Sequence, residues 1–118
     1  MDSGSPGTRP RRHGHDTTFA IERQTDADGT TRLILRGELD AATRGDLHAA
    51  LRAEEHAGAA IVVVLDQLDY LDSAGVAELT RASTEARRAG RRFAVTPGTG
   101  NARLVLWIAG VLDDLCAA

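Results

Sequence analysis

The sequence has no lysine, one cysteine, three prolines and few aromatic residues, which make up 3% of the chain. All 14 basic side chains are therefore arginines, and together with 17 acidic residues they give a formal net charge of −3. A net acidic chain argues against direct binding of nucleic acid, which requires a basic face. The absence of lysine also excludes a phosphate-binding loop that ends in Gly-Lys-Ser/Thr.

The single cysteine, Cys116, cannot form a disulfide within the chain, which is consistent with a reducing compartment. No apolar run approaches the roughly 18–20 residues that cross a membrane, and the first residues lack the apolar segment of a signal peptide. We therefore expect a cytoplasmic protein without membrane insertion.

Known catalytic and metal-binding motifs are also missing. Ser73 is not in a Gly-x-Ser-x-Gly sequence, and neither His-Glu-x-x-His nor Cys-x-x-Cys occurs. His48 and His56 fall on exposed positions of a predicted helix, and His13 and His15 lie near the N-terminus without further ligands. The sequence predicts no enzyme activity, no metal site and no cofactor.

The length of 118 residues suits one small domain, and 42% hydrophobic residues are enough for a core of Leu, Val, Ile and Ala. Residues 1–16 contain Gly, Ser, Pro, Arg and His without apolar periodicity, which predicts a disordered tail. We expect the folded domain to span residues 17–118.

Hydrophobic periodicity predicts an α/β domain with the order β-β-α-β-α-β-α. Because β-α-β connections favour parallel pairing, we expect a small mixed four-stranded sheet covered by helices. The predicted strands are residues 18–24, 31–36, 60–65 and 93–95, and the predicted helices are 43–58, 73–89, 102–109 and 111–116.

Two helix starts show capping patterns. Thr43 is followed three residues later by Asp46, which resembles a capping box. In the loop at residues 97–101, Thr99 or Asn101 is the expected cap of the next helix.

The most informative segment is residues 70–76, directly after the apolar run 61–65. It predicts a buried strand, a short loop, and Ser73 at the point where a helix begins. One interpretation is that Asp72 or Ser73 is only an N-cap, whose oxygen accepts an amide hydrogen bond. The other is that Ser73 also carries a phosphate, stabilised by free backbone N–H groups and the positive end of the helix dipole.

The Gly-Glu-Leu-Asp sequence at 37–40 and the Asp-Ser-Ala-Gly sequence at 72–75, at this separation, resemble the STAS domain of bacterial anti-sigma factor antagonists. The resemblance extends over about residues 17–116, including the Gly-Val-Leu turn at 110–112. It implies a STAS fold and a site around the second motif. The residues expected to bind a partner are Asp40, Asp69, Asp72, Ser73, Ala74 and Gly75.

In that family the serine matching Ser73 is phosphorylated by a partner anti-sigma factor with serine kinase activity. The unphosphorylated antagonist binds this partner and releases a sigma factor, the phosphorylated form lets go, and a serine phosphatase resets the cycle. The resemblance therefore implies a non-enzymatic, phosphorylation-controlled binding switch. Ala74 is a departure, because many antagonists have Ser or Thr there.

Asp-Ser-Ala-Gly also resembles STAS subunits associated with lipid transporters. The alternative function is therefore an accessory subunit of a lipid-type ABC transporter, in which the same helix start docks on the ATPase without a phosphorylation cycle.

A last expectation concerns charge. The loops after the second and third predicted strands emerge at the same sheet edge. We expect Asp40, Asp69, Asp72 and Ser73 to form one exposed acidic patch that faces the partner.

Overall fold

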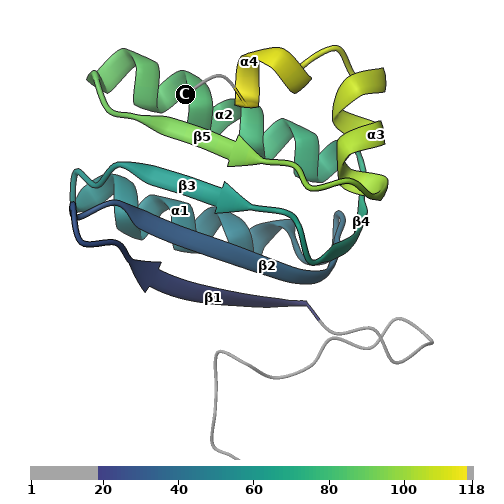
Figure 1. The fold of residues 1–118 in the computed structure, drawn as a ribbon, viewed down its shortest axis with the longest axis horizontal. Helices are drawn as coiled ribbons and strands as arrows, with labels where there is room; N and C mark the ends of the chain where they lie inside the picture. The colour runs from purple at the N-terminus through teal and green to yellow at the C-terminus, as the bar shows by residue number, and fades with distance from the viewer. Residues whose placement is uncertain (1–18, 117–118) are drawn as a thin grey trace, which may run out of the picture.

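The computed structural model describes residues 19–116. The tail predicted at 1–16, with His13 and His15, lies outside the described residues. The described chain forms an α/β domain, as predicted (Figure 1). Its elements are β1 (Ala20–Thr25), β2 (Thr31–Leu39), α1 (Arg44–His56), β3 (Ile61–Val64), β4 (Leu68–Leu71), α2 (Ser73–Ala89), β5 (Phe93–Thr96), α3 (Asn101–Ile108) and α4 (Leu112–Cys116).

The sheet is mixed, with the strand order β1-β2-β3-β5. β1 and β2 form an antiparallel hairpin, while β2, β3 and β5 are parallel. The hairpin turn contains Gly29 at φ +89°, and the Asp28 carboxylate accepts a hydrogen bond from the Thr30 amide at 3.0 Å. The Asp-Gly turn chemistry of the sequence therefore accounts for the first two strands.

β2 changes its partner part-way along its length. Its first half pairs with β3, and its last three residues pair with β4. The change coincides with a bulge between Gly37 and Glu38, and Gly37 has φ +93°, which favours glycine over any residue with a side chain. The bulge lets one strand serve two neighbours.

The sheet has five strands rather than the four predicted, because the sequence pattern does not predict β4. This strand is only four residues long, and its two central residues, Asp69 and Tyr70, are exposed. Its pairing with the distant end of β2 gives no local sequence signal. It ends immediately before Asp72.

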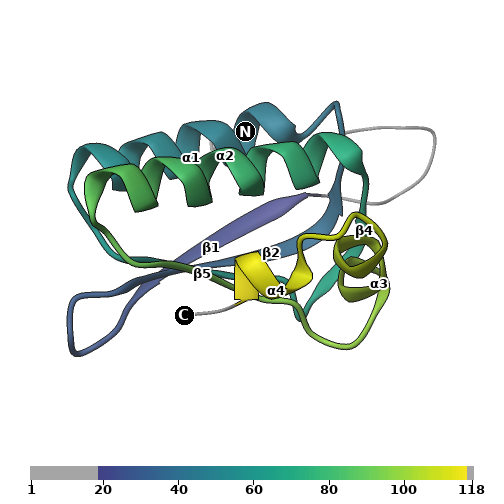
Figure 2. The same ribbon diagram turned by 90° about the horizontal axis from the view of Figure 1, so that it is seen from above.

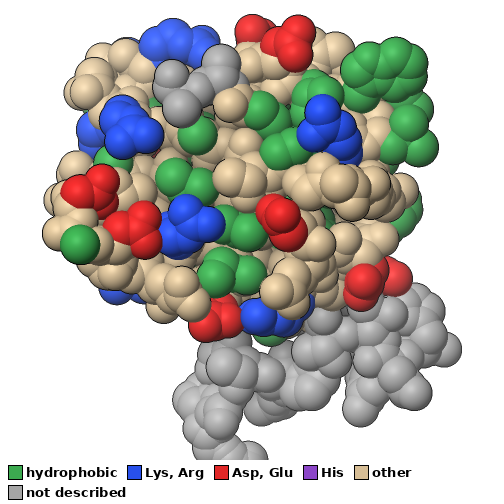
Figure 3. Space-filling model, in the orientation of Figure 1, with side chains coloured by type: hydrophobic (Ala, Val, Ile, Leu, Met, Phe, Trp, Pro, Cys, Tyr) green, Lys and Arg blue, Asp and Glu red, His purple; other side chains and the backbone are tan. Residues whose placement is uncertain are grey.

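Helices α1 and α2 cover one face of the sheet, and α3 and α4 lie beside β4 and β5 (Figures 1 and 2). Burial alternates strictly along β2, as expected for a strand with one covered face. The opposite face shows apolar and charged side chains interspersed (Figure 3). The side chains completely enclosed beneath the helices include Leu33, Leu35, Leu39, Leu47, Leu51 and Leu79.

Candidate functional site

Helix α2 is capped by Asp72. The Asp72 Oδ1 atom accepts hydrogen bonds from the amides of Ala74 at 2.9 Å and Gly75 at 3.2 Å. Asp72 has extended backbone angles, as an N-cap residue should. Of the two caps that the sequence allowed, the structure therefore selects Asp72 and not Ser73.

Ser73 is the first residue of α2 and is exposed. The Ser73 hydroxyl makes no hydrogen bond within residues 19–116. Capping and surface presentation are thus divided between two adjacent residues. The exposed Ser73 hydroxyl therefore takes no part in the cap.

We expected free backbone amides at the start of α2, but three of them already donate hydrogen bonds to Asp72. Asp72 occupies those of Ala74 and Gly75, and the Val76 amide donates to the Asp72 carbonyl at 3.0 Å. A phosphate on Ser73 would therefore share the helix start with a carboxylate that already uses the same donors. The helix dipole remains favourable, but the neighbouring negative charge opposes it.

The position of α2 is fixed from below by Gly75. A Cβ atom at this residue would lie 2.5 Å from Leu71 Cδ1 and 2.8 Å from Leu39 Cγ, distances that no side chain accommodates without a shift. The Asp72 amide also donates to the Leu39 carbonyl at 3.1 Å. The start of α2 is therefore held tightly against the ends of β2 and β4. Gly75 is buried and Ala74 half-buried.

Asp40 organises the turn between β2 and α1. Its Oδ1 atom accepts the amides of Ala42 at 3.0 Å and Thr43 at 3.1 Å, and its carbonyl accepts the Arg44 amide at 2.8 Å. The capping box predicted for Thr43 is wrong. The Thr43 hydroxyl turns back and donates to the Glu38 carbonyl at 2.8 Å, so it makes no side-chain cap to α1.

The residues expected in the acidic patch come from neighbouring segments. The hydrogen bond between the Asp72 amide and the Leu39 carbonyl places the loops of Asp40 and Asp72 side by side, and Asp69 lies on β4, which pairs with the end of β2. Asp69 and Ser73 are exposed, whereas Asp40 and Asp72 are half-buried, and the carboxylate of each accepts two backbone amides. We call this region, made by the β2–α1 turn, β4 and the start of α2, the Ser73 end.

A family model described as "Mlab, STAS domain" matches residues 22–115, which include the whole Ser73 end. The chain belongs to the STAS domain family. Among curated proteins, none matches the chain.

Solved structures show the same fold. The chain is similar to the unphosphorylated form of the anti-sigma factor antagonist SpoIIAA, with a TM-score of 0.70 and 22% identity over 82% of this chain and 85% of that one. For phosphorylated SpoIIAA from Bacillus the TM-score is 0.65, at 22% identity over 82% and 88%. An anti-sigma factor antagonist from Mycobacterium paratuberculosis gives 0.66, at 23% identity over 85% and 84%. The STAS fold expected from the sequence motifs is confirmed.

In this STAS domain α3 is attached directly to the Ser73 end. The Asn101 Oδ1 atom accepts a hydrogen bond from the Leu71 amide at 2.9 Å, two residues before Ser73. The N-cap of α3 is Gly100, without a side-chain cap bond, so the predicted capping by Thr99 or Asn101 is wrong. No local pattern predicts that Asn101 bonds to a strand 30 residues away.

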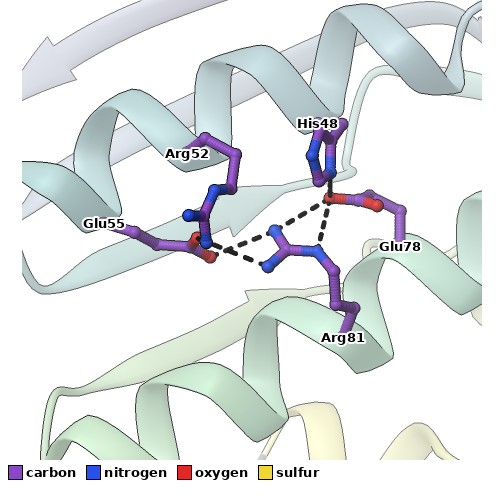
Figure 4. A network of polar contacts seen from close by, with 5 residues as sticks. All are labelled: His48, Arg52, Glu55, Glu78 and Arg81. Carbon is purple, nitrogen blue, oxygen red and sulfur yellow. Dashed lines mark hydrogen bonds and ion pairs between the residues drawn. The ribbon is translucent and has the colours of Figure 1, made fainter.

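A polar network that the sequence pattern does not predict connects α1 and α2 (Figure 4). Glu78 is only 2% exposed, and its Oε2 atom lies 2.9 Å from His48 Nδ1 and accepts Arg81 Nε at 3.0 Å. Arg81 also donates to Glu55 at 3.1 Å, and Arg52 donates to Glu55 at 3.0 Å. Burial alone would lower the pKa of Arg81, but its bonds to Glu78 and Glu55 outweigh that effect and raise it.

Several chemistries find no support among residues 19–116. No group of three or more metal-binding side chains occurs there, and none of the described helices is long and apolar enough to cross a bilayer. Burial raises the pKa of the Cys116 thiol, so the reactive thiolate form is disfavoured at neutral pH.

Proposed function

We propose that this STAS domain is an anti-sigma factor antagonist that binds an anti-sigma factor with serine kinase activity while Ser73 is unphosphorylated. Binding releases a sigma factor, phosphorylation of Ser73 dissociates the complex, and a serine phosphatase restores the binding form. In this role the chain is a substrate and a ligand rather than an enzyme.

The observation that carries this proposal is that the residue that caps α2 and the residue with the exposed hydroxyl are different. Asp72 caps the helix, whereas the exposed Ser73 hydroxyl has no partner within residues 19–116. A serine needed only for capping would direct its oxygen at the second or third amide of the helix. The matches to structures of an antagonist in both unphosphorylated and phosphorylated forms support the same function.

The switch follows from charge and solvation. A phosphate adds about −1.5 to −2 charge at neutral pH. At Ser73 it would stand beside Asp72, whose carboxylate holds the nearest amides. A partner that covers this region would have to desolvate the added charge, and the chain offers it little compensation. Dissociation on phosphorylation is the expected result.

The direct test combines the purified chain with each candidate anti-sigma kinase of the same genome and ATP, followed by mapping of phosphate by mass spectrometry. We expect labelling at Ser73 and loss of labelling in Ser73→Ala. Thr84→Ala, which removes another exposed hydroxyl from α2, is the matched control and should be labelled like the wild type. Equal labelling of Ser73→Ala would show that the assignment is wrong.

The same experiment distinguishes the proposed function from the alternative one. An accessory subunit of a lipid-type ABC transporter would co-purify with a transporter ATPase and would not be modified by any of these kinases. That outcome would replace the proposed function with the alternative.

The Asp40 carboxylate should contribute to partner binding through its charge. Asp40→Asn keeps an oxygen that can accept the amides of Ala42 and Thr43, so the free energy of unfolding should change by less than about 0.5 kcal/mol. Partner affinity should fall, and its salt dependence should weaken, because the lost charge acts over about 8–10 Å. Titrations at two salt concentrations measure both. Unchanged affinity would limit Asp40 to its role in the β2–α1 turn.

A further inference from the structure

The outer face of α3 is uncovered and mostly apolar, and Arg103 is its one charged residue. Leu104, Trp107 and Ile108 are 53%, 66% and 69% exposed, and their spacing of three and four residues puts them on one side of the helix. Hydrophobic side chains gather on the surface over α3 (Figure 3). Among the described residues the remaining exposed large hydrophobic side chain is Tyr70, on β4, the strand against which α3 packs. We call these four residues the α3 surface.

The inner face of the same helix is apolar too. Ala102 and Leu106 are buried in the core, and Val105 is half-buried. A helix on the surface of a monomer normally has polar residues opposite its apolar stripe, and a helix apolar on all sides normally lies in an interior. Apart from Arg103, the exposed side of α3 carries apolar residues where a solvent-facing helix normally has polar ones.

The α3 surface continues the Ser73 end. The Asn101–Leu71 hydrogen bond ties the first residue of α3 to the last residue of β4, and Ser73 follows two residues later. α3, β4 and the start of α2 lie at the same end of the molecule in both views (Figures 1 and 2). The eight residues of α3 extend about 12 Å. One standard interface of about 800 Å² per partner is roughly 32 Å across, enough to include both.

We propose that the α3 surface is the apolar centre of the interface with the protein that reads Ser73, with Trp107 as its principal anchor. This inference rests on the proposed function and specifies the partner. The partner presents an apolar patch to α3 and basic side chains to Asp69 and Asp72, which border the patch. Buried aromatic anchors dominate affinity, whereas charges at a rim govern association and selectivity. A phosphate on Ser73 would therefore act at the rim of a contact whose affinity comes from α3.

The test uses the anti-sigma kinase that labels Ser73 as the binding probe. Trp107→Ala should weaken its affinity for the unphosphorylated chain about 30-fold, the size expected for a hot-spot residue. Trp107→Phe keeps an aromatic anchor and should lose much less. Arg88→Ala, an exposed change at the opposite end of α2, is the matched control and should bind like the wild type. Circular dichroism of each variant checks that the fold is retained.

A second readout does not depend on a variant. Trp107 is the only tryptophan, so incorporation of fluorotryptophan gives one fluorine NMR signal from the α3 surface. This signal should shift when the kinase is added, and should not depend on the concentration of the chain alone. A concentration-dependent shift without kinase would assign the surface to a second copy of the chain and overturn the inference.

The outcomes separate this inference from the proposed function. If the kinase binds wild type and Trp107→Ala equally, and the fluorine signal stays in place, the α3 inference is wrong while the proposed function stands. If no anti-sigma kinase binds or labels the wild type, the proposed function fails and the inference falls with it. Binding of a purified transporter ATPase with the same loss in Trp107→Ala would assign the surface to a different partner and overturn the inference as well.

Discussion

Two regions of this STAS domain reverse the usual distribution of polar and apolar side chains. Between α1 and α2, carboxylates are buried: Glu78 is enclosed, and His48 and Arg81 approach it from both helices. On the outer side of α3, Leu104 and Trp107 are exposed. The buried charges find their partners within the chain, whereas the exposed apolar surface lies at the same end of the molecule as Ser73.

The difference shows how to assign a role to an unusual residue. A buried polar group with all its partners inside the molecule contributes to the specificity of the fold. A contiguous patch of exposed apolar side chains contributes little to the fold and marks an interaction surface. The first region should therefore respond to mutation through stability, and the second through binding.

The sharpest form of the comparison uses two leucines of α3. Leu106 is completely buried, and Leu106→Ala should reduce the free energy of unfolding by about 3 kcal/mol through lost packing and a cavity. Leu104→Ala, two positions away, should change it by less than about 0.5 kcal/mol. Urea denaturation measures both. A large loss in Leu104→Ala would mean that the outer face already packs within the monomer.

The next largest loss of stability is expected for a mutation in the polar network between α1 and α2. Glu78→Ala removes the carboxylate shared by His48 and Arg81 and should cost about 2 kcal/mol, since both partners keep partial access to water. Glu85→Ala on the same helix is the control and should be nearly neutral. If Glu78→Ala is equally neutral, the network does not stabilise the packing of α1 on α2.

A second buried carboxylate should make stability depend on pH. Glu54 accepts hydrogen bonds from Arg23 and Thr31, and the Arg23 bond holds the pKa of Glu54 below its usual 4.5. Its stabilisation is therefore complete above the unfolded pKa and is lost as pH falls through the lower folded pKa. Glu54→Gln should cost about 1.5 kcal/mol at neutral pH, from weaker hydrogen bonds to Arg23.

The difference between Glu54→Gln and wild type should narrow in acid. Urea denaturation at about pH 7 and about pH 3 measures the two gaps. A gap that stays constant or widens below the unfolded pKa would contradict the role assigned to the charged form of Glu54.

The smallest effect distinguishes the two residues at the start of α2. Asp72→Ala removes the cap and should cost about 1 kcal/mol. Ser73→Ala should change stability by less than about 0.5 kcal/mol, because its hydroxyl holds nothing within residues 19–116. Thermal unfolding of both variants tests this. A larger loss of stability in Ser73→Ala would show that the serine has a structural role.

Much of the fold follows from local sequence patterns. The buried positions of α1 and α2 follow their apolar spacing, with Leu47 and Leu79 as predicted, and Gly90 ends α2 in a left-handed conformation. The sequence also predicts the start of α2 near Ser73, and the structure begins the helix there. These features depend on neighbours within a few positions in the chain.

The missed features depend on distant partners. β4 is defined by its pairing with β2, and Asn101 by its bond to Leu71. Glu78 looks like a solvent residue in sequence, and only the approach of α1 brings His48 to it. The sequence predicts a helix at 102–109 but does not distinguish the inner face of α3 from the outer, because apolar residues lie on both.

The contact of Gly75 with Leu39 and Leu71 has a consequence for how this domain can diversify. The start of α2 packs directly on these two side chains, so a group added to the exposed Ser73 would lie outside the core. Exposed residues around it, such as Asp69 and Trp107, have no share in that contact. Duplicated copies that differ only in these exposed residues could therefore acquire separate partners while keeping one scaffold.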